Sequence, residues 1–126
     1  MTDLETNKQT VVSYYETAFG GEPEMAVAQY MGNTYTQHNP EADNGAEAFI
    51  RFVHALRSSN PELQLFIKRV IAEGDIVVTH AHLVLKPGDR GVALADFFRL
   101  KDGKVVEHWD VIQPVPEASA NPNGMF

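Results

Sequence analysis

Three apolar stretches decide the fold of this chain: IVVTHAHLVL at 76–85, VALADFFRL at 92–100 and KVVEHWDV at 104–111. Turn-forming residues at 86–91 and the dipeptide Asp102-Gly103 separate them, which predicts three neighbouring antiparallel strands. Each stretch also carries histidine or aspartate among its apolar residues. Burial of an ionisable group is costly unless the group is paired or neutralised. These residues are therefore either anchored structurally or used in function.

The first two strands, aligned across their turn, bring a histidine to an aspartate. Because side chains alternate between the two faces of a strand, the alignment predicts His82 opposite Asp96 and His80 opposite Phe98. Directly opposed Cβ atoms lie about 4.5–5.5 Å apart, close enough for a hydrogen bond between His82 and Asp96. A structural role is the alternative, with Asp96 in a salt bridge and both histidines satisfied within the core. The convergence of three ionisable groups with aromatic side chains favours a ligand site.

The Asp102-Gly103 turn leaves two registers open for the third strand. A plain two-residue turn places Trp109 beside Asp96. A one-residue β-bulge shifts the register and places Asp110 there instead. Both Trp109 and Asp110 are therefore candidate neighbours of Asp96.

The residues before these strands predict three helices and one further strand. Apolar residues recur at helical spacing in three segments, of which the first ends at Gly20-Gly21. The second includes Met31, and a short extended piece follows it at 35–40, where it ends at a proline. The third follows Asn44 and ends before Asn60-Pro61. From Glu62 the apolar residues alternate through a long strand that ends at Gly74-Asp75. A run of helices followed by a run of strands predicts an α+β fold, with three N-terminal helices packed on one face of a curved antiparallel sheet.

Length and composition limit the classes of function. The 126 residues are enough for one domain, spanning 1–126, in which 114–126 form a C-terminal tail rich in Pro, Asn and Ala. A net charge of −7 with only 10 Lys and Arg residues argues against nucleic-acid binding. The sequence shows no apolar run of about 20 residues, no signal segment and no cysteine. We therefore expect a cytoplasmic protein that does not enter membranes.

Several of these motifs resemble one known family. Asp96–Leu100, the Asp-Gly-Lys turn at 102–104 and Val105–Asp110 are similar to the SnoaL-like polyketide cyclase group of the nuclear transport factor 2-like superfamily. The resemblance extends from the first helix to about Gln113. It implies a cone-shaped α+β barrel in which three helices close over a strongly bent antiparallel sheet. It also implies a small-molecule pocket inside the cone and a homodimer formed through the outer face of the sheet.

The resemblance also implies roles for the clustered residues. In the cyclases of this family a pocket aspartate acts as general acid and base in an intramolecular aldol condensation, helped by a histidine on the preceding strand. Asp96 and His82 match these positions, while His80 stands where this sequence departs from the cyclases. We therefore expect a cofactor-independent acid–base enzyme, of the cyclase, isomerase or lyase kind, acting on a small hydrophobic carbonyl compound. The candidate catalytic residues are Asp96, His82 and His80, and the candidate substrate-binding residues are His38, Tyr35, Phe98, Trp109 and Asp110.

Two other functions stay open at this level. His80 and His82 share one strand face and, with His38, Asp96 or Glu107, have the residue types of a metal site. Cupins place a glutamate three or four positions after their second histidine, and here Leu85 and Lys86 occupy these positions, so we expect no metal. The expected acid–base chemistry requires no other cofactor. The same fold also serves as a non-catalytic binding or assembly module, and fold alone does not decide function.

Overall fold

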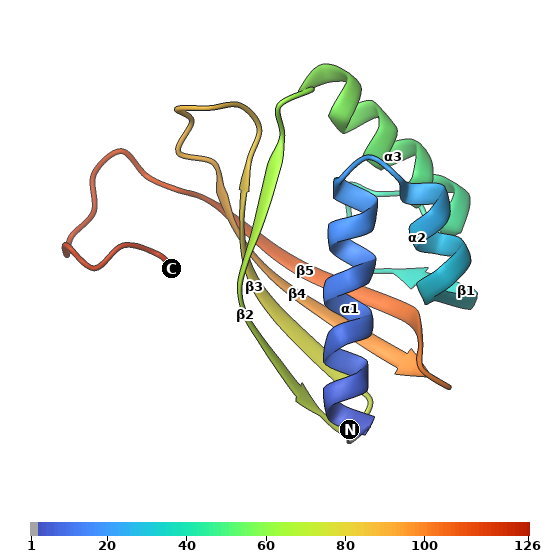
Figure 1. The fold of residues 1–126 in the computed structure, drawn as a ribbon. Helices are drawn as coiled ribbons and strands as arrows, with labels where there is room; N and C mark the ends of the chain where they lie inside the picture. Colours follow the sequence, from blue (N-terminus) through green and yellow to red (C-terminus); the bar gives the residue numbers. More distant parts are fainter. Residues whose placement is uncertain (1–2) are drawn as a thin grey trace.

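Three helices cover one face of a curved five-stranded sheet in the computed structural model, which describes residues 3–126 (Figure 1). The elements in chain order are α1 (Asp3–Phe19), α2 (Pro23–Tyr30), β1 (Met31–Gln37), α3 (Ala46–Ser59), β2 (Gln64–Glu73), β3 (Ile76–Val84), β4 (Val92–Lys101) and β5 (Lys104–Pro114). The predicted α+β class, with three helices packed on one face of a curved sheet, is confirmed. The sheet is curved but open, because β1 and β2 form two separate edges in this part of the chain.

The sheet is mixed rather than purely antiparallel because β1 joins it. The strand order is β1-β5-β4-β3-β2, with β2 to β5 antiparallel and β1 parallel to β5. The sequence predicted only a short extended piece at 35–40 after a helix that includes Met31, whereas β1 begins at Met31. Its partner strand lies far along the chain, and a pairing of that kind leaves no periodic signal in the local sequence.

Helix α1 contributes one apolar stripe to the core. Its buried residues recur at positions i, i+3, i+4, i+7 and i+8 and are Val11, Tyr14, Tyr15, Ala18 and Phe19. The rings of Tyr14 and Tyr15 pack edge-on against Phe98 of β4, with ring centroids 6.2 and 4.9 Å away. The stripe therefore brings two tyrosines of α1 to the inner face of the sheet.

None of the helices within residues 3–126 has both the length and the apolar character that crossing a membrane requires.

The register between β3 and β4 differs from the predicted one. Thr79, not His82, lies opposite Asp96. The shift from 82 to 79 is an odd number of residues, so the histidines of β3 lie on the other face of the sheet from Asp96. The physical reason is that β3 carries aliphatic residues on both faces, so its pattern alone does not select the buried one. The helices cover the row that contains Val77 and Ala81, which are fully buried, and the histidines face outward.

The turn between β4 and β5 combines both predicted alternatives. Asp102 has φ 52° and Gly103 φ 75°, the positive values that a tight two-residue hairpin turn needs. A bulge follows within the same pair of strands and places Asp110 opposite Asp96. The bulged register is therefore confirmed for the neighbour of Asp96, and Trp109 faces the outer side of the sheet.

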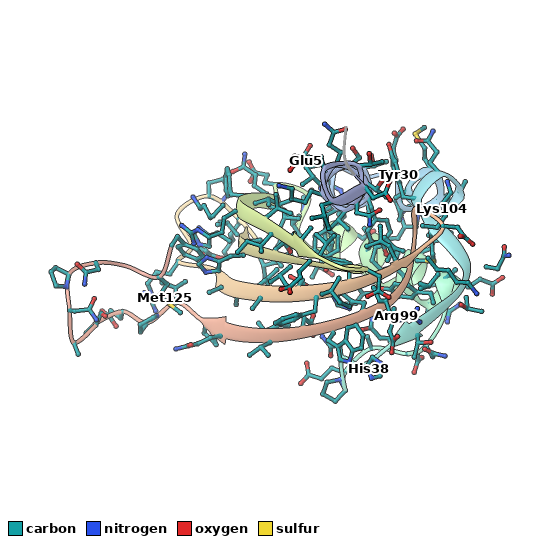
Figure 2. The ribbon with its side chains drawn as sticks, turned by 90° about the horizontal axis from the view of Figure 1, so that it is seen from below. Glu5, Tyr30, His38, Arg99, Lys104 and Met125 are labelled. Atoms are coloured by element: carbon teal, nitrogen blue, oxygen red, sulfur yellow. The ribbon has the colours of Figure 1, made fainter. Side chains whose placement is uncertain are left out.

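The C-terminal tail returns to the outer face of the sheet. After β5 the chain loops away and comes back beside the sheet, where Met125 lies (Figures 1 and 2). The Phe126 ring stacks on the ring of His82, with 4.3 Å between centroids, and on that of His80 at 5.5 Å. The two histidines thus hold the tail on the face away from the helices.

Phe126→Ala is expected to lower the free energy of unfolding by about 0.5–1.5 kcal/mol, the usual contribution of an aromatic pair. The variant loses the ring that stacks on both imidazoles, and urea unfolding at pH 7 measures the loss. Asn123→Ala is the matched control, because Asn123 is an exposed residue of the same tail. Equal stability of the Phe126→Ala variant and the parent protein would show that the docked tail does not stabilise the fold.

Candidate active site

Asp96 is buried on the inner face of β4, with 1% of its side chain exposed. Its Oδ1 accepts a hydrogen bond from the Tyr15 hydroxyl at 2.6 Å and lies 2.7 Å from Nε2 of His108. Burial and the neighbouring Asp96 raise the pKa of Tyr15 well above its ordinary value, so the hydroxyl stays protonated and remains a donor. The Asp96 Oδ2 has no hydrogen-bond partner among residues 3–126. One carboxylate oxygen is thus anchored by two neighbours, while the other keeps its lone pairs free.

His108 on β5, not His82, is the histidine that lies beside Asp96. Its side chain is 5% exposed. The imidazole packs against Phe98, with ring centroids 5.1 Å apart, and stacks on Tyr35 at 6.4 Å. Packing against these two aromatic rings restricts the orientation of the imidazole that faces the carboxylate.

Four polar residues of this site lie outside the sequence prediction: His108, Tyr15, Gln37 and Asn39. The bulged register contained a signal for His108, because it puts residues 108 and 110 on the same face. Tyr15 belongs to the apolar stripe of α1, where a tyrosine is equally typical of the core. Gln37 ends β1, and its Oε1 lies 2.7 Å from His108 Nδ1. No local pattern indicated that β1 pairs with β5.

Asp110 is the second carboxylate of the site, directly across from Asp96 and with 10% of its side chain exposed. Its Oδ2 accepts a hydrogen bond from Nδ2 of Asn39 at 3.1 Å and lies 3.9 Å from His108 Nε2. Burial raises the pKa of Asp110 above its ordinary value; the hydrogen bond from Asn39 and the charge of His108 oppose this effect, and the charge of Asp96 adds to it. The protonated form of Asp110 is therefore favoured relative to a carboxyl group in water.

A small cavity lies against these polar groups. Its volume is about 80 Å³, and Asp96, His108 and Asp110 form part of its wall. Most of the remaining wall is apolar and includes Phe19, Tyr35, Phe49 and Leu94. The cavity thus places two carboxylates and an imidazole beside a space suited to an apolar ligand.

A larger groove adjoins the cavity. Phe52, Leu56 and Leu83 line the cavity and also line an adjoining groove of about 550 Å³. The loop at 88–92 and Pro114 form other parts of the groove wall. These three side chains therefore form a wall that the cavity and the groove have in common.

The structure places His80 and His82 away from this cavity, which corrects the predicted pairing of His82 with Asp96. Besides stacking on the tail, His82 Nε2 donates to the backbone carbonyl of Arg90 at 2.6 Å. The Arg69 guanidinium is in hydrogen-bond contact with Nδ1 of His80. Both histidines thus have structural partners on the outer side of the sheet.

His38 and Trp109 also lie on the outer side, although the sequence indicated both of them as candidate substrate-binding residues. Figure 2 shows His38 on the side of the sheet opposite Glu5 and Tyr30 of the helices. The imidazole of His38 stacks on the Trp109 ring at 4.8 Å, and its Nε2 lies 2.7 Å from Glu107. The physical reason is again the register, because Trp109 alternates with the inward-facing His108 and Asp110.

Glu107 binds both His38 and Arg99 on the outer face, and these residues form an outer cluster with Trp109. Its Oε1 accepts a hydrogen bond from Nε of Arg99 at 2.7 Å, and its Oε2 is the atom that contacts His38. The hydrogen bonds from His38 and Arg99 lower the pKa of Glu107 below its ordinary value. The cluster therefore fixes the end of β1 against β5.

The other predicted wall residues divide between cavity and core. Tyr35 lines the cavity, as does Asp110. Phe98 is fully buried in the core, where its ring supports Tyr15 and His108. Phe98 therefore supports two residues of the site from the core and does not line the cavity.

The predicted metal-binding residues do not come together either, since His80 and His82 lie apart from Asp96. A different set, formed by Asp96, His108 and Asp110, offers one ligand atom each within 4.8 Å of one another. Their atoms face one another and Asn39 in the contacts described above. We assign no metal to them.

Comparison with known proteins agrees with this architecture. Among curated proteins, none matches the chain. A crystal structure of a protein from Kribbella flavida, provisionally named a ketosteroid isomerase, is 26% identical, with 98% of this chain and 87% of that one covered and a TM-score of 0.73. A provisionally named SnoaL-like polyketide cyclase from Jannaschia sp. CCS1 is 25% identical, with 89% of each chain covered and a TM-score of 0.70.

A third structure is similar in fold alone. It is a provisionally named polyketide cyclase from Bacillus cereus, 19% identical over 85% of this chain and 74% of that one, with a TM-score of 0.74. The sequence model of the SnoaL-like domain matches residues 11–108, which include the second half of α1, all of β4 with Asp96, and the start of β5 as far as His108. The resemblance seen in the sequence is thereby confirmed, and the chain belongs to the SnoaL-like domain family.

Proposed function

We propose that this protein is a cofactor-independent acid–base enzyme that acts on a small apolar carbonyl compound, as aldol cyclases and isomerases do. The observation that carries the proposal is that the two oxygens of the Asp96 carboxylate differ in their hydrogen-bond partners. Tyr15 and His108 anchor its Oδ1, while Oδ2 has no hydrogen-bond partner among the described residues. A buried carboxylate with one free oxygen beside an apolar cavity is suited to act as a base.

The two carboxylates have environments that favour different roles. Asp96 faces the Tyr15 hydroxyl and the His108 imidazole through its Oδ1, and its Oδ2 takes a proton from the carbon next to the substrate carbonyl. Asp110 has a raised pKa, so its protonated form donates to the carbonyl oxygen as the enol forms. Return of a proton to a different carbon gives an isomer, whereas attack of the enol on a second carbonyl gives an aldol product.

The dimensions of the site define the kind of substrate that we propose. A cavity needs a volume of about 10–15 Å³ to hold one water molecule. The cavity of about 80 Å³ therefore has room for about five to eight groups of that size. The reacting carbonyl end of the substrate, with one small ring or a short chain, fits this space. The apolar remainder lies in the groove of about 550 Å³ beyond Phe52, Leu56 and Leu83.

Hydrogen exchange in D2O tests the proposal and does not require the product to be identified. A panel of cyclic ketones and polyketide-like esters is incubated with the protein, and mass spectrometry follows deuterium entering next to the carbonyl. We expect enzyme-dependent exchange for members whose reacting end is small. A panel whose members raise the melting temperature but never exchange would instead favour a non-catalytic binding module.

We also propose that two copies of the chain associate through the outer face of the sheet. Val78, Phe97 and Trp109 are cross-strand neighbours there, and Val111 is 67% exposed. Exposed apolar surface of this kind is typical of a protein interface.

Val111→Lys is expected to convert the dimer to a monomer in analytical ultracentrifugation. Met25→Lys, at an exposed residue of α2, is the control, and a parent protein that sediments as a monomer would contradict the proposal.

A further inference from the structure

Gln37 places its amide oxygen against the imidazole of His108. The Oε1 atom lies 2.7 Å from His108 Nδ1. The same oxygen accepts hydrogen bonds from the backbone N–H groups of His38 and Asn39, each at 3.1 Å. The His38 N–H is shared with the backbone carbonyl of His108 at 3.0 Å, whereas the Asn39 N–H has no second acceptor within residues 3–126. An amide nitrogen in this position would face two N–H donors, so the atom must be the oxygen.

This arrangement determines which nitrogen of His108 carries a proton. An amide oxygen has no hydrogen to donate, so Nδ1 is the donor and keeps its proton. A neutral imidazole has only one protonated nitrogen, and Nε2 of a neutral His108 is therefore an acceptor. Asp96 Oδ1 lies 2.7 Å from that Nε2. Two facing lone pairs would repel, so one proton lies between them, bonded either to Asp96 or to His108.

We infer that Gln37 is a positioning residue that holds His108 in its Nδ1-protonated form and thereby gives the Asp96–His108 pair one transferable proton. Asp96 becomes a carboxylate when this proton moves to His108 Nε2, over the 2.7 Å between the two atoms. Oδ2 of Asp96 then receives the substrate proton while the imidazolium stays beside Oδ1. Without Gln37, a neutral His108 can carry its single ring proton on Nε2 instead of Nδ1. The tautomer stands on the contacts alone, and only its use in catalysis rests on the proposed function.

Nitrogen NMR of the imidazole rings tests the tautomer directly and needs no substrate. Long-range proton–nitrogen correlation distinguishes a protonated ring nitrogen from an unprotonated one, and loss of signals in His108→Gln assigns the ring. At a pH at which the ring is neutral, we expect His108 of the parent protein to be protonated at Nδ1. Gln37→Met removes the acceptor at similar length and is expected to shift the proton to Nε2. Gln37→Glu keeps an acceptor oxygen and is expected to retain the Nδ1 proton.

Two results would overturn the inference. One is a neutral His108 protonated at Nε2 in the parent protein, a measurement that does not depend on whether any variant folds. The other is a folded Gln37→Met protein whose His108 signals match those of the parent. His54 on α3, whose Nε2 contacts Glu24, provides an internal control ring that should not change in any variant.

Activity separates the inference from the function on which its catalytic part rests. With a compound that exchanges in D2O, we expect Gln37→Met to lower kcat by about 10–100-fold with little change in KM, and Gln37→Glu to restore it. The same range is typical of hydrogen-bond partners that orient metal-bound histidines. If the expected tautomer is observed but no compound exchanges, the proposed function fails and the positioning role of Gln37 stands. If exchange occurs but the tautomer differs, the role of Gln37 fails alone.

Discussion

Asp96→Asn is expected to lower turnover by about 10²–10⁴-fold, the usual contribution of a positioned acid–base group, while the protein stays folded. The amide oxygen can still accept the hydrogen bond from Tyr15, so the geometry around position 96 is preserved. An amide does not take up a proton as a carboxylate does, so the base is lost. The rate of deuterium exchange measures turnover, and circular dichroism with urea unfolding measures the fold.

Two histidine variants provide the matched controls for this prediction. His108→Gln is expected to reduce exchange severely, because His108 lies beside the carboxylate. His82→Gln is expected to leave exchange near that of the parent protein, because His82 lies on the outer face beneath Phe126. Full activity of the Asp96→Asn protein, or equal losses in the two histidine variants, would contradict the assignment of the site.

Phe98→Ala is expected to lower the free energy of unfolding by about 3–5 kcal/mol, as truncation of a fully buried phenylalanine generally does. Phe98 is 0% exposed and its ring packs against those of Tyr14, Tyr15 and His108. The variant loses this buried surface and leaves a cavity beneath the site. Urea unfolding followed by tyrosine fluorescence and circular dichroism measures the difference.

Phe97→Ala is the control, since it removes the same ring from the neighbouring position on β4. Phe97 points to the outer face and is 38% exposed, so its truncation is expected to cost clearly less. Both variants are measured at protein concentrations low enough to dissociate any dimer. Comparable losses for Phe97 and Phe98 would show that the face of β4 that packs on the helices has been assigned wrongly.

The fold was predicted correctly wherever a local sequence pattern indicated a helix, a strand or a turn. Helical spacing identified α1, α2 and α3, and alternation of apolar residues identified β2 to β5. The Asp102-Gly103 turn was predictable because few residues adopt positive φ values easily. β1 was largely missed, because it is short and pairs with a strand distant in the sequence.

The prediction of the site was partly right for the same reason. Asp96 lies on the inner face of β4 as predicted, and Asp110 is its neighbour in one of the two registers left open. The placement of His82 was wrong, because β3 is aliphatic on both faces and an odd shift in register reverses them. The histidines were the most visible polar residues of β3, yet the inward position opposite Asp96 belongs to Thr79.

The sequence by itself determined that this chain has an acidic residue on an apolar strand, three helices to cover it and a turn that joins β4 to β5. Only the tertiary structure decided which groups meet that residue. Tyr15 comes from α1, 81 residues before Asp96, and Gln37 reaches His108 from β1 across 71 residues. Periodicity reports which face of an element is buried, whereas contacts between distant elements depend on how the helices and the edge strand pack on the sheet. The Asp96–His108 pair and the amide that orients it are therefore products of packing.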